Sequence, residues 1–242
     1  MKHGNFSDID YVRGEVGLPV KTVFILANSI KKSQRCVAGR EVLEDSGGES
    51  YWGGWVRPVT DHDEGAISLT ECRLQDRTIP VPYDVVQIST TSNEGNPTQP
   101  ENWYIEKSFR WTKTGRWGRR EAEQLVETPD NLWLEPRMRQ DRVTPQYLTS
   151  CVNHQSLYLI KPQDFCFSVE GGRLRCTFTY LSHAHNFSMT DPIVSKKYFP
   201  NWPNIPSERV EPKQKDNLLI CVSLTPEFKG HHYKIVATVL ED

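Results

Sequence analysis

Short apolar runs separated by turn-forming segments make up the first half of the chain. They are rich in β-branched and aromatic residues, and clusters of Gly, Pro, Asn and Ser such as DSGGES lie between them. Runs of this length and composition predict strands. The predicted strands are TVFILA (22–27), RCVAGREVLE (35–44), YWGGWVRPV (51–59), YDVVQIS (83–89) and ENWYIEK (101–107). One stretch, GRREAEQLVE (118–127), favours a helix instead.

The second half contains a clear hairpin, DFCFSVE-GG-RLRCTFTY. Gly171 and Gly172 supply the positive φ values that a two-residue turn needs, and this turn fixes the register. An apolar face and a polar face result, as in a sheet that is buried on one side. The apolar pairs are Val169 with Leu174, Phe167 with Cys176 and Phe165 with Phe178, and the polar pairs are Glu170 with Arg173 and Ser168 with Arg175.

Two short helices and three further strands complete this half. Thr144-Pro145 and Asp191-Pro192 each offer an N-cap followed by a first-turn proline, which predicts a helix after each. The further strands are SLYLIK (156–161), NLLICVSL (217–224) and HHYKIVATVLE (231–241).

Each half therefore holds five or six strands, which is the strand count of the OB-fold, a five-stranded Greek-key barrel. The predicted fold class is mainly β, with two tandem OB-like barrels and a few short helices. The predicted boundaries are an N-terminal extension at 1–20, a first barrel at 21–135 and a second barrel at 145–242.

The positive charge of the chain is concentrated in one segment. The net charge is -2 and the pI is near 6.4, which excludes a protein that coats duplex DNA by bulk charge. Residues 103–120 nevertheless hold six Lys or Arg and one Glu, interleaved with aromatic rings. We call these residues the basic-aromatic segment.

Cations interleaved with rings suit a single-stranded nucleic acid, because phosphates need positive charge and bases stack on flat faces. The competing interpretation is an ordinary strand that buries its rings and solvates its cations. A break at Thr114-Gly115 favours the first interpretation, because it predicts a loop in which Trp117 has no sheet face to pack on. The predicted contacts here are Trp103, Arg110, Trp111, Lys113, Arg116, Trp117, Arg119 and Arg120.

Three other places offer cations for the same ligand. Lys31, Lys32 and Arg35 belong to the turn between the first two strands, and such loops grip ligands in OB barrels; the alternative is a solvated turn. Arg57, in an apolar strand, is either paired inside the fold or aimed at a ligand. Arg175 lies on the polar face of the hairpin, where it can follow a nucleic-acid backbone.

Catalytic and metal-binding patterns are weak. His183, His185, His231 and His232 raise the question of a metal site, but no Cys pair or acidic cluster accompanies them. We therefore predict no metal and no cofactor and favour a protein that is not an enzyme, with a metal-dependent nuclease as the enzymatic alternative. Six cysteines without a CxxC pair, an N-terminus unlike a signal peptide and the absence of an apolar run of about 18 residues predict a cytoplasmic protein that does not enter a membrane.

Several segments resemble the dual OB-containing domain family of bacterial proteins, over about residues 22–240. In the first half they are VFILANSIKKSQRCVAG, GGWVRPV, EGAISL, YDVV and ENWYI, and in the second half they are RCTFTY, HNFSMTDP and CVSLTPEFKGHHYKIVATVL. The resemblance implies two tandem OB-like barrels, binding of a nucleic acid or nucleotide, and a role beside prokaryotic defence genes. It implies no catalytic activity.

The leading hypothesis is a non-enzymatic protein that binds single-stranded nucleic acid. The first alternative is a sensor of a nucleotide or an ADP-ribose-like molecule. The second is an adaptor that docks a protein partner through exposed rings, since Trp, Tyr and Arg also dominate protein interfaces.

Overall fold

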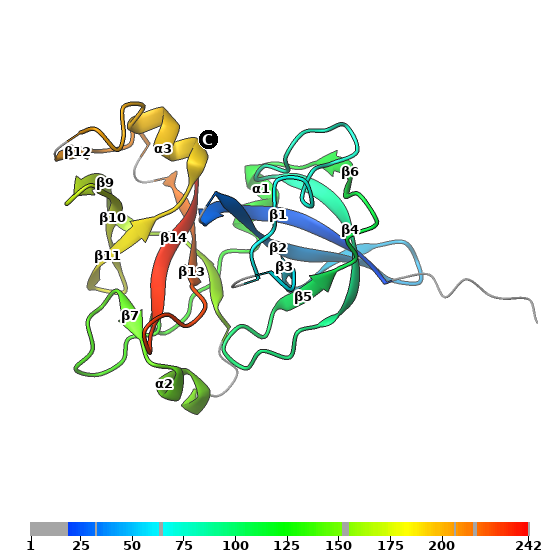
Figure 1. Cartoon of the computed structure of the whole chain (residues 1–242), viewed down its shortest axis with the longest axis horizontal. Coiled ribbons are helices and arrows are strands. Elements are labelled where there is room, and N and C mark those ends of the chain that lie inside the picture. Colours follow the sequence, from blue (N-terminus) through cyan, green and yellow to red (C-terminus); the bar gives the residue numbers. More distant parts are fainter. Residues whose placement is uncertain are drawn as a thin grey trace, which may run out of the picture.

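The computed structural model describes residues 19–31, 33–62, 65–151, 155–205, 207–214 and 217–241. Figure 1 shows two β-rich bodies side by side, with β13 and β14 of the second turned toward the first. The N-terminal extension predicted at 1–20 lies outside the described residues except for its last two. No described helix is long and apolar enough to cross a bilayer.

The first body is a closed five-stranded barrel. Its strands are β1 (Val20–Lys31), β2 (Gln34–Glu44), β3 (Ser50–Val59), β4 (Asp84–Asn93) and β5 (Asn102–Ile105). They follow the order β1-β2-β3-β5-β4, and β4 pairs with β1 to close the circuit. Only the β3–β5 pairing is parallel. This is the predicted OB-type barrel.

The basic-aromatic segment continues this sheet. The sixth strand, β6 (Thr112–Arg116), pairs with β4, and α1 (Arg119–Glu123) follows it. The loop predicted at Thr114-Gly115 is wrong: Gly115 is paired with Val85 inside the strand. A glycine between two polar residues resembles a turn signal, but here it extends an edge strand.

The second body repeats the strand order of the first. Its sheet runs β12-β9-β10-β11-β14-β13-β8, with β7 beside β14 and a parallel β11–β14 pairing. Its strands are β7 (Arg142–Val143), β8 (Leu157–Ile160), β9 (Gln163–Glu170), β10 (Arg173–Tyr180), β11 (His183–Met189), β12 (Glu208–Val210), β13 (Leu219–Leu224) and β14 (His232–Leu240).

Strands β8 and β9 together take the place that β1 has in the first barrel. Lys161-Pro162 separates them, and a proline cannot donate to the sheet. β8 pairs with β13 and β9 pairs with β10, so the circuit closes through this interrupted strand. The prediction of two OB-like barrels is therefore confirmed.

Both predicted N-caps begin helices, α2 (Pro145–Ser150) and α3 (Pro192–Tyr198). Thr144 accepts a hydrogen bond from the Tyr147 backbone, and Asp191 accepts from the backbones of Ile193 and Val194. In the predicted hairpin, Leu174 faces Val169 as expected, but the register shifts beyond Thr177.

Three apolar clusters hold the molecule together. One fills the first barrel, one fills the second, and the third lies between them. The run VFIL in β1 explains the third cluster: Val23 and Ile25 face the interior of the first barrel, while Phe24 and Leu26 pack toward Leu157 and the rest of the second barrel. β1 is therefore covered on both faces.

Candidate functional site

A groove with a basic lining runs between the β1–β2 turn of the first barrel and α3 of the second. It has a volume of about 510 Å³ and is lined by three cations and no acid. We call it the α3 groove. Its lining residues are Asn28, Arg35, Ile79, Val81, Pro192, Ile193, Lys196 and Lys197.

Backbone hydrogen bonds between the barrels bring the two walls of the α3 groove together. The Ile30 amide donates to the Thr190 carbonyl at 2.9 Å, and the Asn28 amide donates to the Thr238 hydroxyl at 3.1 Å. The end of β1 is therefore attached to the segment that leads into α3. The side chains of Arg35 and Lys196 come from positions far apart in sequence but line one hollow.

Asp191 fixes the orientation of α3. One carboxylate oxygen accepts from the amides of Ile193 and Val194 at 2.8 and 3.1 Å, and the other accepts from the Val239 amide at 2.9 Å. The side chain is buried, and burial raises the pKa of its carboxyl. Asp191 thereby attaches the first turn of α3 to β14. This attachment fixes the position of the helix that carries Lys196 and Lys197.

A second hollow, of about 370 Å³, adjoins the α3 groove because both are lined by Pro192 and Lys196. It contains Trp202, whose side chain is 42% exposed. The Trp202 indole N–H donates to the Gly172 carbonyl at 3.1 Å, which holds the ring against the β9–β10 turn. An exposed flat ring therefore lines the same hollow as Lys196, which is also one of the cations of the α3 groove.

The cations of the groove differ in their surroundings. Lys197 forms an ion pair with Glu241 at 2.6 Å, and this hydrogen bond raises the pKa of the lysine. Arg35 is half-buried in the wall. The predicted contact Lys31 ends β1, but its side chain and the whole of Lys32 lie outside the described residues.

A family model described as a dual OB-containing domain matches residues 21–239. The chain belongs to the dual OB-containing domain family. No curated protein matches the sequence. Among solved structures, the chain is similar to the crystal structure of the tetrameric p202 HIN2, with 9% identity, coverage of 93% of this chain and 96% of that one, and a TM-score of 0.27.

Within this dual OB chain, Trp111 is not available for stacking. Its side chain is 1% exposed and belongs to the apolar interior of the first barrel. Trp111 lies just before β6 and pairs with Leu74 in an isolated bridge, whereas Phe109, two positions earlier, is 56% exposed, so strand alternation does not account for the burial of Trp111. Trp103 is half-buried against the same interior, and the Lys21 ammonium lies 3.8 Å from the centre of its ring.

The cations of the basic-aromatic segment are partly neutralised. Lys113 and Arg116 both contact Asp84, at 2.7 and 2.8 Å. Arg119 pairs with Glu123 at 3.1 Å and also donates to the Leu240 carbonyl. Two further cations, Arg110 and Arg120, are exposed. Trp117 is half-buried and packs on the cluster between the barrels.

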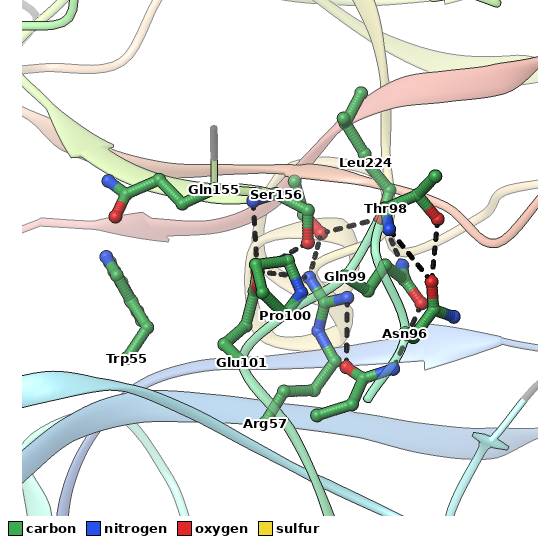
Figure 2. Close-up of polar contacts among 12 residues, drawn as sticks. Trp55, Arg57, Asn96, Thr98, Gln99, Pro100, Glu101, Gln155, Ser156 and Leu224 are labelled. Carbon is green, nitrogen blue, oxygen red and sulfur yellow. Dashed lines mark hydrogen bonds and ion pairs between the residues drawn. The ribbon is translucent and has the colours of Figure 1, made fainter. Parts of the chain in front are cut away.

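Arg57 lies inside the contact between the barrels, where its guanidinium is paired within the protein. Its guanidinium lies 3.6 Å from Glu101 and donates to the Ser223 hydroxyl at 3.0 Å. Figure 2 shows it turned toward Glu101, which also accepts from Ser156 of the second barrel. Of the two interpretations of Arg57, the internal pair is the one observed.

Arg175 lies on the outer face of β10, as predicted, but its guanidinium is held there. It donates to the Asn186 side chain at 2.7 Å and to the Ser188 hydroxyl at 2.9 Å. The four histidines of the second barrel are divided between two environments. His183 is exposed and His231 is half-buried, whereas His185 and His232 are buried inside the barrel.

Sequence reasoning missed Lys196, Lys197 and Trp202. The run SKKYFPNW does combine cations with rings, as the basic-aromatic segment does. Its helix was predicted, but its position opposite the β1–β2 turn depends on how the two barrels pack. A local sequence pattern does not show how the two barrels pack against each other.

Proposed function

We propose that the protein binds single-stranded nucleic acid along the α3 groove, with phosphates near Arg35 and Lys196 and a base stacked on Trp202. The observation that carries the proposal is the groove itself, in which three cations and no acid line a hollow beside an exposed indole. Positive grooves with flanking rings suit single strands of any sequence.

The position of the groove agrees with the way OB barrels are used. Such barrels bind oligonucleotides with the face of strands 2 and 3 and with the adjacent loops. In the first barrel, Ala38 of β2 and Trp55 of β3 belong to the cluster that packs against the second barrel. That face is covered, and Gln99 of the β4–β5 loop donates to the Leu224 carbonyl of the second barrel, so we place the ligand at the β1–β2 turn.

A mononucleotide is the second candidate ligand. The cavity beside Arg57, between the barrels, has only about 110 Å³, whereas pockets for drug-sized ligands have about 300–1,000 Å³. The α3 groove, at about 510 Å³, falls within that range. The nucleotide alternative therefore concerns the same groove.

Fluorescence anisotropy with labelled oligo-dT and oligo-U tests the proposal. Lys196→Glu is expected to weaken binding by at least about 10-fold, because it removes one phosphate contact and adds repulsion. Arg120→Glu, the same charge reversal at an exposed position of α1, is the matched control and leaves the affinity within about twofold.

No binding of either oligonucleotide at low salt contradicts the proposal. Loss of binding in Arg120→Glu but not in Lys196→Glu also contradicts it and returns the site to the basic-aromatic segment. Thermal stabilisation by a mononucleotide, with no affinity for oligonucleotides, assigns the groove to the small ligand.

A further inference from the structure

Two indoles of the first barrel form a corner beside a small hollow, away from the α3 groove. The ring centroids of Trp52 and Trp117 are 5.4 Å apart, and the ring planes meet at 82°. The hollow has a volume of about 190 Å³. Tyr51, Glu121 and Gln124 also line it, and the Tyr51 side chain is 52% exposed.

Two neighbouring residues, Phe24 and Gln124, hold the Trp52 and Trp117 rings in place. The fully buried ring of Phe24 lies 5.7 Å from Trp52 and 5.3 Å from Trp117, centroid to centroid. The Trp52 indole N–H donates to the Gln124 side chain at 3.3 Å. The two aromatic walls are therefore set before any ligand arrives.

Among the described residues, the one charged residue that lines the hollow is acidic. Glu121 is part of the wall, and one of its oxygens accepts from the Gly118 amide at 2.9 Å. Ser50, at the rim, is the strand partner of Glu44, and the turn between them also carries Asp45 and Glu49. None of the lining residues is a cation. The nearest cations, Arg40 beside Gly53 and the arginines that flank Trp117, lie outside the lining, so the hollow itself favours positive over negative charge.

We propose that this corner binds an alkylated ammonium group, either quaternary or methylated. The faces of indole rings attract such cations, and aromatic corners with a carboxylate recognise choline-like and methyl-lysine groups. The volume is below the range of pockets for whole drug-sized ligands, about 300–1,000 Å³, so it suits a head group. The proposal does not depend on nucleic-acid binding, because the two ligands have opposite charge.

Binding of choline, compared with its neutral carbon isostere dimethylbutanol, tests the proposal in the full chain. The indole N–H resonances of Trp52 and Trp117 report the occupancy. Choline is expected to saturate the signal and to bind about fivefold more tightly than the isostere, since cation–π attraction at an exposed site supplies this much. Equal affinity for the two probes, or no saturation by choline, overturns the proposal.

Variants locate the site. Glu121→Gln and Tyr51→Ala are expected to weaken choline binding about threefold each. Phe109→Ala is the matched control, because the Phe109 side chain is 56% exposed and lies outside the hollow. If Glu121→Gln fails to fold, Tyr51→Ala still decides, because its ring is on the surface. Unchanged choline affinity in Tyr51→Ala, or an equal loss in Phe109→Ala, overturns the assignment.

Two further titrations separate the sources of the group and the competing ligand. A trimethyl-lysine peptide that binds more tightly than choline assigns the group to a partner protein, and weaker binding assigns it to a small molecule. Displacement of choline by oligo-dT overturns the proposal, because it shows that the indoles stack on bases instead.

Discussion

At the scale of single residues, a buried charge inside the second barrel is the least expected feature. The Lys234 side chain is 1% exposed, and its ammonium has no hydrogen-bond partner among the described residues. Burial lowers the pKa of Lys234 to about 8. The centre of the Phe187 ring, 6.0 Å from the ammonium, offers only a weak attraction.

The sign of the resulting pH dependence follows from the two pKa values. The unfolded chain holds the proton of this lysine up to about pH 10.4, whereas the folded chain releases it near pH 8. Between these values the unfolded state carries more protons, so stability rises with pH. Below pH 8 both states are protonated, and the folded state bears the full cost of a buried ammonium.

Lys234→Met is therefore expected to stabilise the protein at pH 7 by about 1–3 kcal/mol, because it removes the buried charge and keeps the shape. The gain shrinks as the pH rises from 8 to 10. Denaturant unfolding at several pH values measures the gain in stability at pH 7 and its change with pH. Lys161→Met is the control, because the Lys161 side chain is exposed. A variant less stable than the parent at pH 7, or a gain that does not change with pH, contradicts this account.

At the scale of elements, the composition of the strands and the residues of the turns predicted most of the fold. The hairpin across Gly171-Gly172 and both capped helices follow from local sequence, because their determinants lie within a few residues. Local sequence failed at β6, where Gly115 continues a strand that is completed by a partner, Val85, 30 positions earlier.

The same elements also show why the candidate site was only partly predictable. The turn carrying Arg35 was expected to meet a ligand, but α3 forms the opposite wall of its groove. The acid that neutralises Lys113 and Arg116 is Asp84, which belongs to another strand. Charge counted along the sequence cannot show such pairs.

The β1–β2 pairing gives an element-scale prediction. A Cβ atom at Gly39 would overlap the carbonyl oxygen of Phe24, beside the bulge between Ile25 and Ala27, whereas one at Gly54 of β3 would meet nothing within 4 Å. Gly39→Ala is expected to cost about 3 kcal/mol of stability, and Gly54→Ala less than about 0.5 kcal/mol. Urea unfolding compares the two, and equal effects would show that strand entropy, not close approach, decides.

At the scale of the whole molecule, the two barrels share one apolar cluster. Leu157, Leu159 and Leu219 of the second barrel are buried in the cluster that contains Leu26 and Trp55 of the first. The hydrogen bond from the Arg57 guanidinium to the Ser223 hydroxyl and the hydrogen bonds from Ser156 to the Glu101 carboxylate also connect the barrels. Separating the barrels would expose this apolar face and remove these hydrogen bonds from the buried Arg57 and Glu101.

We therefore expect a single unfolding transition. Calorimetry should give one peak whose calorimetric and van't Hoff enthalpies agree, because unfolding of either barrel exposes the apolar cluster that the other barrel shares. Two separated transitions, or a truncated second barrel that stays monomeric and folded, would contradict a rigid groove between the barrels.

The central claim is that the α3 groove, built by both barrels, is where a nucleic-acid strand lies, and the salt dependence of oligonucleotide binding tests it most directly. Contacts with Arg35 and Lys196 predict that log K falls with log salt at a slope of about -1.4, roughly 0.7 per phosphate. The double variant Arg35→Ala with Lys196→Ala should bring the slope to about zero, while Arg110→Ala with Arg120→Ala should leave it unchanged. The opposite pattern, a slope changed only by the second pair, would contradict the account.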